Sequence, residues 1–312
     1  MKTTPVTKDD LTNSVIAVPP LPRSVDGTIN AAGIATLTAY LRAGGVITAL
    51  WGGNANLYNM GLAEFASCLD AFEAAAPGQD WAIPSIGPDF GKAMDQINAL
   101  QGRNFPTVMV LPLSFPTRSA GVATGLRRIA DAYGKPIVAY VKSEGYLDPV
   151  DLGRLVADGV ISFVKYAVVR DDPSNDPYLD RMLEKIPADI MVSGIGERPV
   201  IPHLTKFGLT GFTSGSVCVA PNLSDGIRRA LLEGDSTLAA QLREAFLPLE
   251  DLRDGFSPIL VLHHAVALAN IVATGEPAPF LAPLSDPQLI NEIEHAARTL
   301  ADKDTAVQKA VA

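Results

Sequence analysis

The strongest constraint on the fold is a repeated alternation of short apolar runs with amphipathic segments between residues 14 and 234. Short apolar runs are typical of buried strands, and apolar residues at helical spacing are typical of helices that pack by one face. The expected strands are 14–18, 45–51, 81–86, 106–113, 136–140, 160–165, 188–194 and 209–215. The expected helices are 29–43, 62–76, 90–100, 120–134, 149–157, 176–186, 198–208 and 223–234.

Apolar strands joined by helical crossovers indicate a parallel sheet that is covered on both faces. Eight successive units favour an α/β fold closed into a (β/α)₈ barrel, the TIM barrel. A doubly wound open sheet is the alternative. The Gly-rich GxGxxG turn of that fold is missing after the first strand, where the proline-rich PPLPRSVDG follows instead.

After residue 234 the pattern changes to helices only, in the segments 236–252, 258–273 and 285–302. We therefore expect two regions, a (β/α)₈ barrel over 1–234 and a C-terminal helical region over 235–312. The second region is expected to pack on the barrel or on a neighbouring subunit.

The composition limits the classes of function. The 312 residues carry a net charge of −9, with 47% hydrophobic and 19% charged residues, and no basic stretch that could neutralise nucleic-acid phosphates. The N-terminal MKTTPVTKDDLTNS lacks the apolar core of an export signal, and no apolar run approaches the roughly 20 residues of a membrane span. We expect a cytoplasmic metabolic protein without a nucleic-acid or membrane partner.

The cysteines and histidines show no ligand spacing. Cys68 and Cys218 are too few for a disulfide scaffold and are expected in the core. His263 and His264 are adjacent, so a helix would point them about 100° apart and they could not clamp one metal together. The other two histidines lack an acidic ligand pattern. We therefore expect neither a metal nor a cofactor.

Catalytic groups of a TIM barrel come from the carboxyl ends of the strands and the loops that follow. Lys165 ends an apolar run, and lysine is almost never fully buried without a partner or a function. An amine aimed into the barrel mouth would be desolvated, and its pKa would have to fall from about 10.4 to about 7–8 for it to attack a ketone and form a Schiff base. Tyr140 ends the preceding run and could move the protons of that reaction. Alone it would be better explained as an amphipathic tyrosine at the rim, but the pair with Lys165 favours the catalytic interpretation.

Other strand ends supply candidate substrate-binding residues. The two glycines of WGGNAN (51–56) bring backbone N–H groups close to a ligand, which suits a carboxylate and makes Gly53 and Asn54 candidates. An ordinary turn explains the same residues. The segments LPLSFPT, SGIGER and GFTSGS place Ser114, Ser193 and Thr213 at the same mouth.

At these residues the chain resembles the dihydrodipicolinate synthase/N-acetylneuraminate lyase family of class I aldolases, over most of its length. The most specific part is the spacing of IVAY (137–140) to FVK (163–165), which looks like the family's strand-5 tyrosine and strand-6 lysine. GLTGFTSGSVCVAPNLSDGIRRALLEGD (208–235) and DIMVSGIGER (189–198) resemble its strand-8 and strand-7 segments. WGGNAN stands at the Gly-Thr-Thr-Gly-Glu motif, which binds the carboxylate of a 2-oxo acid.

The resemblance implies a barrel with C-terminal helices that assembles as a homo-oligomer, a tetramer or a dimer. It also implies that Lys165 forms the Schiff base, that Tyr140 is its proton-transfer partner, and that Gly53 and Asn54 hold the carboxylate of a pyruvate-like 2-oxo acid. The expected function is that of a carbon–carbon or carbon–oxygen lyase. A dehydratase of a 2-oxo-3-deoxy sugar acid and a non-catalytic barrel that binds a small acid are the alternatives.

Three departures from the family pattern argue against dihydrodipicolinate synthase activity itself. Gly53 and Asn54 replace the two threonines of the motif, so the threonine hydroxyl relay is absent. Ser114 stands where the family has a tyrosine. The segment VKSEGYLDP (141–149) offers Lys142 but lacks the arginine that holds a second carboxylate in dihydrodipicolinate synthase. None of these departures removes the Schiff-base lysine.

Overall fold

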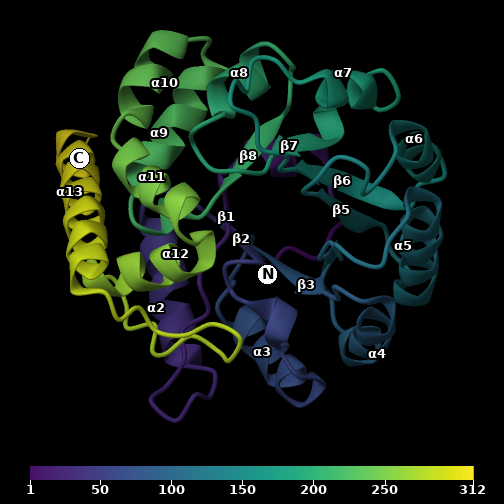
Figure 1. The fold of residues 1–312 in the computed structure, drawn as a ribbon, viewed down its shortest axis with the longest axis horizontal. Coiled ribbons are helices and arrows are strands. Elements are labelled where there is room, and N and C mark those ends of the chain that lie inside the picture. Colours follow the sequence, from purple (N-terminus) through teal and green to yellow (C-terminus); the bar gives the residue numbers. More distant parts are fainter. Residues whose placement is uncertain (312) are drawn as a thin grey trace.

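In the computed structural model, which describes residues 1–311, eight parallel strands close into a barrel in chain order (Figure 1). The strands are β1 (Ile16–Ala17), β2 (Thr48–Trp51), β3 (Trp81–Ile86), β4 (Met109–Val110), β5 (Ile137–Val141), β6 (Ile161–Tyr166), β7 (Met191–Ser193) and β8 (Gly211–Ser214). Pairing of β1 with β8 closes the barrel. The (β/α)₈ barrel expected from the sequence is confirmed.

A helix follows each strand and covers the outside of the barrel. These helices are α2 (Ala31–Ala43), α3 (Leu62–Ala74), α4 (Phe90–Leu100), α5 (Ser119–Tyr133), α6 (Pro149–Ala157), α7 (Pro177–Leu183), α8 (Val200–Thr205) and α9 (Pro221–Leu232). The short α1 (Lys8–Thr12) packs against the first residue of β8 and so lies at the amino ends of the strands. Single 3₁₀ turns occur at η1 (Leu57–Asn59), η2 (Ala188–Ile190) and η3 (Ser216–Cys218).

Local sequence explains where several helices begin. The Asp89 carboxylate accepts a hydrogen bond from the Lys92 amide at the start of α4. Asp148 does the same for Val150 at the start of α6, where Pro149 occupies the first turn. Both are N-cap arrangements that satisfy free amides of the first turn, and α4 and α6 have the bounds expected from the sequence.

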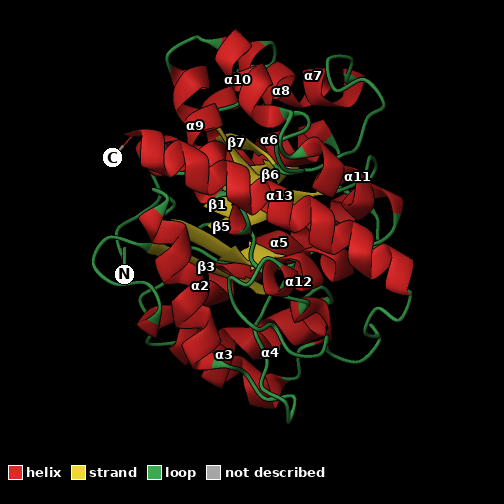
Figure 2. Ribbon diagram, turned by 90° about the vertical axis from the view of Figure 1, so that its left-hand side faces the viewer, coloured by secondary structure: helices red, strands yellow, loops and turns green. Residues whose placement is uncertain are grey.

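Four helices follow the barrel, α10 (Ser236–Arg243), α11 (Leu247–Gly255), α12 (Pro258–Leu268) and α13 (Pro287–Val311). The sequence pattern predicts one helix over 236–252, but the structure has a break between α10 and α11. Pro248 lies in the first turn of α11 and cannot donate the amide bond that an uninterrupted helix needs. Figure 1 shows α13 on the outer side, with α9, α11 and α12 between it and the barrel, and in Figure 2 α13 lies at the front.

The C-terminal helices share a buried apolar cluster with one side of the barrel. Val15 and Ala17 around β1, Leu37 of α2, Val261 of α12 and Ile293 of α13 all belong to it. None of these five side chains is accessible to solvent. Among residues 1–311, no helix combines the length and the apolar composition needed to cross a lipid bilayer.

Candidate active site

Two neighbouring strands bring Lys165 and Tyr140 together. The register of β5 and β6 pairs Tyr140 directly with Lys165, and the amine Nζ lies 4.2 Å from the centroid of the tyrosine ring. The next residue, Tyr166, points outward, because its hydroxyl donates a 2.6 Å hydrogen bond to Asp176 just before α7. Since side chains alternate along a strand, Lys165 points into the barrel.

The surroundings of Lys165 disfavour its protonated form. The residue is only 4% exposed. Burial, with a smaller contribution from the nearby cations Lys142 and Arg253, lowers the pKa of the amine to about 7. An amine with this pKa is about half neutral at pH 7, which is the form that attacks a carbonyl carbon.

Two tyrosines, Tyr140 and Tyr58, line the same cavity as Lys165. Burial raises the pKa of Tyr140 above its usual 10, and it raises the pKa of Tyr58 to about 12. Both phenols are therefore protonated at neutral pH and can donate a hydrogen bond or a proton. Tyr58 flanks the Gly-Gly turn in the sequence, whereas Trp51 on its other side stacks on Phe72 at 4.4 Å between barrel and helix.

These side chains line a cavity of about 220 Å³ at the carboxyl ends of the strands. Of the residues proposed from the sequence, it includes Lys165, Tyr140, Gly53, Asn54 and Thr213. The cavity therefore collects side chains and backbone from β2, β5, β6 and β8, which are far apart in the chain.

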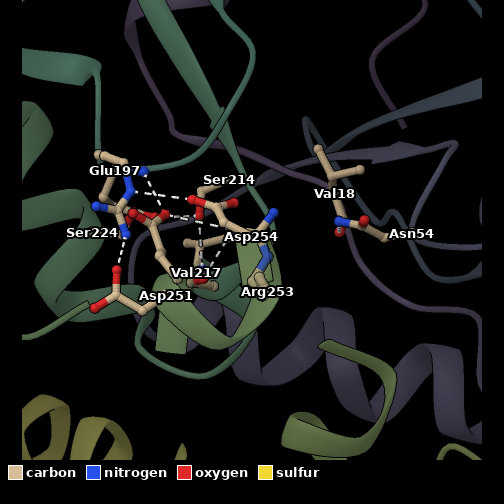
Figure 3. Close-up of polar contacts among 12 residues, drawn as sticks. Val18, Asn54, Glu197, Ser214, Val217, Ser224, Asp251, Arg253 and Asp254 are labelled. Atoms are coloured by element: carbon tan, nitrogen blue, oxygen red, sulfur yellow. Dashed lines mark hydrogen bonds and ion pairs between the residues drawn. The ribbon is translucent and has the colours of Figure 1, made fainter. Parts of the chain in front are cut away.

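The turn after β2 presents free backbone donors. Within the described chain, no hydrogen bond uses the backbone N–H of Gly53 or of Asn54. The Asn54 side chain is engaged, because its Nδ2 donates to the carbonyl oxygen of Val18 at 2.8 Å (Figure 3). This contact ties the turn to the end of β1 and leaves the two backbone amides available for an anion.

The structure places Ser193 away from the cavity. Its hydroxyl lies 2.8 Å from Nδ1 of His203 on α8, in the layer between barrel and helices. β7 is three residues long, and the register pairs Ser193 with the outward-pointing Tyr166. Gly194, the next residue, reaches the cavity instead.

Ser114 is also outside the cavity. β4 ends at Val110, earlier than the expected 113, so Ser114 lies in an exposed loop, where its carbonyl oxygen accepts a hydrogen bond from the Thr117 hydroxyl. Its neighbour Phe115 is 83% exposed. Neither residue lines the cavity.

Sequence reasoning missed Arg253. It lies in the last turn of α11, is 7% exposed, and lines the cavity together with Asp254. Nothing in the segment LRDGF distinguishes this arginine from an ordinary helix residue. Only the packing of α11 over the barrel reveals its position.

A buried acidic pair stands behind Arg253. Glu197 and Glu250 are 0% and 1% exposed. The Glu197 carboxylate accepts hydrogen bonds from Ser214 at 2.8 Å and Ser224 at 2.6 Å, and Glu250 accepts one from the Glu197 amide at 2.9 Å (Figure 3). Burial and the neighbouring Glu197 raise the pKa of Glu250 well above its usual range.

The two cysteines and the adjacent His263 and His264 have structural surroundings. Cys68 and Cys218 are fully buried in apolar clusters. The His263 ring bonds to the carbonyl oxygen of Gly275, and the His264 ring accepts from the Leu284 amide. In the part of the chain that the structure describes, no group of three or more His, Cys, Asp or Glu side chains is arranged to hold a metal ion.

No protein-family model matches the chain, and no curated protein sequence matches it. Solved structures match it in fold. Dihydrodipicolinate synthase from Bacillus clausii superposes with a TM-score of 0.81 at 22% identity, over 95% of this chain and 99% of that one. YagE, a prophage protein of the dihydrodipicolinic acid synthase family from Escherichia coli K12, was solved in complex with pyruvate. It gives a TM-score of 0.79 at 17% identity, over 92% and 98%.

A catalytic lysine mutant of sialic acid aldolase from Ruminococcus gnavus gives a TM-score of 0.82 at 15% identity, over 96% of this chain and 98% of that one. The chain therefore has the fold of dihydrodipicolinate synthases and sialic acid aldolases over nearly its whole length. The coverage extends to the C-terminal helices.

Proposed function

We propose that the protein is a lyase or aldolase that binds a 2-oxo acid as a Schiff base on Lys165. The observation that carries this proposal is the placement of a buried amine, with a pKa near 7, beside Tyr140 at the mouth of the barrel. A lysine with no catalytic work would gain by reaching water, since burial of its charge is costly. The fold shared with a pyruvate-bound protein and with an aldolase that has a catalytic lysine supports the same reading.

In the proposed reaction, neutral Nζ of Lys165 attacks the oxo carbon and forms a carbinolamine. Tyr140 delivers a proton to the departing hydroxyl, which leaves as water while the C=N bond forms. In a carbon–carbon cleavage, the C4 hydroxyl loses its proton and the electron pair of the C3–C4 bond passes to the iminium, which releases an aldehyde and leaves an enamine. In a carbon–oxygen cleavage, loss of a proton from C3 gives the enamine, whose electron pair then expels the C4 hydroxyl, and this hydroxyl takes up a proton and leaves as water. The carboxylate of the acid lies against the amides of Gly53 and Asn54.

Proton exchange at pyruvate tests this chemistry without knowledge of the second substrate. Deprotonation of the iminium next to the C=N bond gives an enamine, and its return in D₂O places deuterium in the methyl group. We expect the protein to exchange these protons and Lys165→Arg to lose the exchange, because a guanidinium stays protonated. Lys142→Arg, in which the other cavity lysine is replaced, is the matched control.

Binding of pyruvate without any exchange would support a non-catalytic acid-binding barrel. Exchange retained in Lys165→Arg would remove Lys165 from the reaction. A panel of 2-oxo-3-deoxy sugar acids would then separate the cleavage reaction from the dehydratase alternative, because only cleavage releases an aldehyde.

The proposal includes assembly into a homo-oligomer, a tetramer or a dimer. Exposed apolar side chains such as Val169 at 71% and Phe115 at 83% are available for contacts between subunits. Light scattering of the purified protein measures this state directly, and a monomer at all concentrations would contradict it.

A further inference from the structure

Arg253 lines the cavity, and its guanidinium makes only long contacts with the residues that the structure describes. Its Nη1 lies 3.5 Å from Oε1 of Glu250 and 3.4 Å from Oγ of Ser216. Charge-assisted hydrogen bonds are typically about 2.7–2.9 Å long, so both contacts are long. The buried Nε has no hydrogen-bond partner among residues 1–311. A planar group with several N–H donors therefore has unused capacity at the cavity wall.

The acids nearby do not cancel this positive charge. Two carboxyls as deeply buried and as close together as Glu197 and Glu250 cannot both ionise, so the pair keeps a proton. Burial raises the pKa of both carboxyls, and the pKa of Glu250, the carboxyl nearest Arg253, is raised well above its usual range. Asp254 also lines the cavity, but its carboxylate lies 3.2 Å from Nε of Arg198 at the surface.

The backbone fixes where the guanidinium can lie. Gly196 has a φ of +92°, and a Cβ atom there would collide with the Glu250 carboxylate. The loop after β7 can therefore pack tightly against Glu250 and Arg253 only because residue 196 is glycine. Arg253 adjoins this loop on one side and η3, after β8, on the other.

Arg253 and the free amides of the β2 turn belong to different parts of the cavity wall. Gly53 and Asn54 follow β2, whereas Arg253 adjoins the loops after β7 and β8. Asn54, with Val18, lies to one side of the cluster around Arg253 (Figure 3). An acid held at the β2 turn, with its oxo carbon at Lys165 on β6, has the rest of its chain free to extend toward β7 and β8.

We propose that Arg253 binds a second carboxylate of the substrate, so that the substrate is a dicarboxylic 2-oxo acid. The inference rests on the Schiff-base function for the position of the oxo carbon and adds the substrate class. The guanidinium fork matches a carboxylate with two parallel hydrogen bonds. A single guanidinium matches the single charge of a carboxylate more closely than the double charge of a phosphate dianion. The arginine missing from the segment after Tyr140 is thus replaced from the C-terminal helices.

The test compares borohydride trapping of 2-oxoglutarate with that of 2-oxopentanoate, which has the same number of carbons and lacks the second charge. In the unmodified protein we expect half-maximal trapping of 2-oxoglutarate at about 10- to 100-fold lower concentration. Arg253→Gln should remove this preference, because it weakens the trapping of 2-oxoglutarate more than that of 2-oxopentanoate or pyruvate, with each protein measured at its own pH optimum. Arg198→Gln, at the surface arginine that pairs with Asp254, is the matched control and should keep the preference.

Several outcomes would overturn the proposal. If the unmodified protein traps 2-oxoglutarate and 2-oxopentanoate at the same half-maximal concentration, the proposal is wrong, whether or not Arg253→Gln folds. An equal loss of pyruvate and 2-oxoglutarate trapping in a folded Arg253→Gln would show that Arg253 serves the first carboxylate or only the shape of the cavity.

Calorimetric titration with glutarate separates this inference from the Schiff base, because glutarate has two carboxylates and no oxo group. Glutarate binding that Arg253→Gln abolishes, without trapping of any 2-oxo acid, would retain the carboxylate receptor and refute the Schiff base. If the protein traps pyruvate but neither binds glutarate nor prefers 2-oxoglutarate, the role of Arg253 is refuted and the Schiff base is retained.

Discussion

Lys165 carries a stability cost that its proposed function explains. A buried amine that would be cationic in water weakens the fold, because the protonated form loses hydration without an ion-pair partner. Its pKa is about 7 in the fold, against about 10.4 for an unfolded chain. One pKa unit corresponds to about 1.4 kcal/mol, so the full shift corresponds to about 4–5 kcal/mol, an upper limit for the cost.

We therefore expect Lys165→Met to raise the free energy of unfolding by about 2–4 kcal/mol at pH 7. Between pH 7 and 10.4 the unfolded chain binds more protons than the fold, so the stability of the unmodified protein rises with pH in this window. The difference in free energy of unfolding between Lys165→Met and the unmodified protein must therefore shrink over the same pH range. Urea unfolding at several pH values measures the free energy of unfolding of the variant and of the unmodified protein. Lys142→Met is the control, because Lys142 is exposed and its replacement should change the free energy of unfolding by less than about 0.5 kcal/mol. A destabilised Lys165→Met would contradict the account of the amine.

Tyr140 should affect the rate of the chemistry more than the binding of the acid. We expect Tyr140→Phe to slow methyl-proton exchange of pyruvate by about 10²–10⁴, because the variant lacks the hydroxyl that moves the proton. The pyruvate concentration at half-saturation should change little, since the carboxylate contacts lie on the β2 turn. Tyr133→Phe is the control, because that hydroxyl bonds to the Phe105 carbonyl. An unchanged exchange rate in Tyr140→Phe would assign the proton transfer to another group.

At the scale of the elements, strand register decides which sequence expectations the structure meets. The alternation in 160–165 puts Ile161, Phe163 and Lys165 on one face but cannot say which face is interior. The contacts of Tyr166 with the outer helices settle this in the structure. Ser193 sits on a strand of three residues, which is too short for its sequence pattern to reveal a face.

The turn after β2 should bind the carboxylate of the 2-oxo acid through its backbone amides. Gly53→Ala adds a Cβ whose nearest neighbour is the Tyr58 ring at 3.7 Å, an ordinary contact, so pyruvate binding should be nearly unchanged. Gly53→Pro deletes the N–H and should weaken pyruvate binding by about 1–3 kcal/mol. Calorimetry measures the affinities, and thermal unfolding checks that both variants fold. Equal affinities in two folded variants would remove the Gly53 amide from the site.

On the scale of the whole molecule, the sequence pattern identifies the barrel because eight strand–helix units recur in order. It does not locate Arg253, because the position of α11 depends on contacts between residues distant in the chain. The proposed boundary at residue 234 marks the point where the alternation of strands and helices in the sequence ends. The C-terminal helices share a buried cluster with β1 and α2, and α11 supplies part of the cavity wall.

We predict that residues 1–234 alone do not fold cooperatively. Removal of α10–α13 would expose the apolar side of the barrel around Val15, Leu37 and Ile227, each of which is 0% exposed in the full chain. Burial of side chains such as these stabilises by about 1.5–3 kcal/mol each, and a domain of ordinary stability cannot lose several of them. Circular dichroism during heating should show no sharp transition for the fragment, in contrast to the full chain. A sharp transition would make the barrel an independent folding unit.

The central claim is that Lys165 carries the substrate as an imine, and the most direct measurement is peptide mapping of the protein after reduction with borohydride in the presence of pyruvate. The account predicts one reduced pyruvyl adduct per chain, on the peptide that contains Lys165, with a yield that rises as the pH passes through about 7. No adduct at any pH between 6 and 9, or an adduct on Lys142 in place of Lys165, would contradict it.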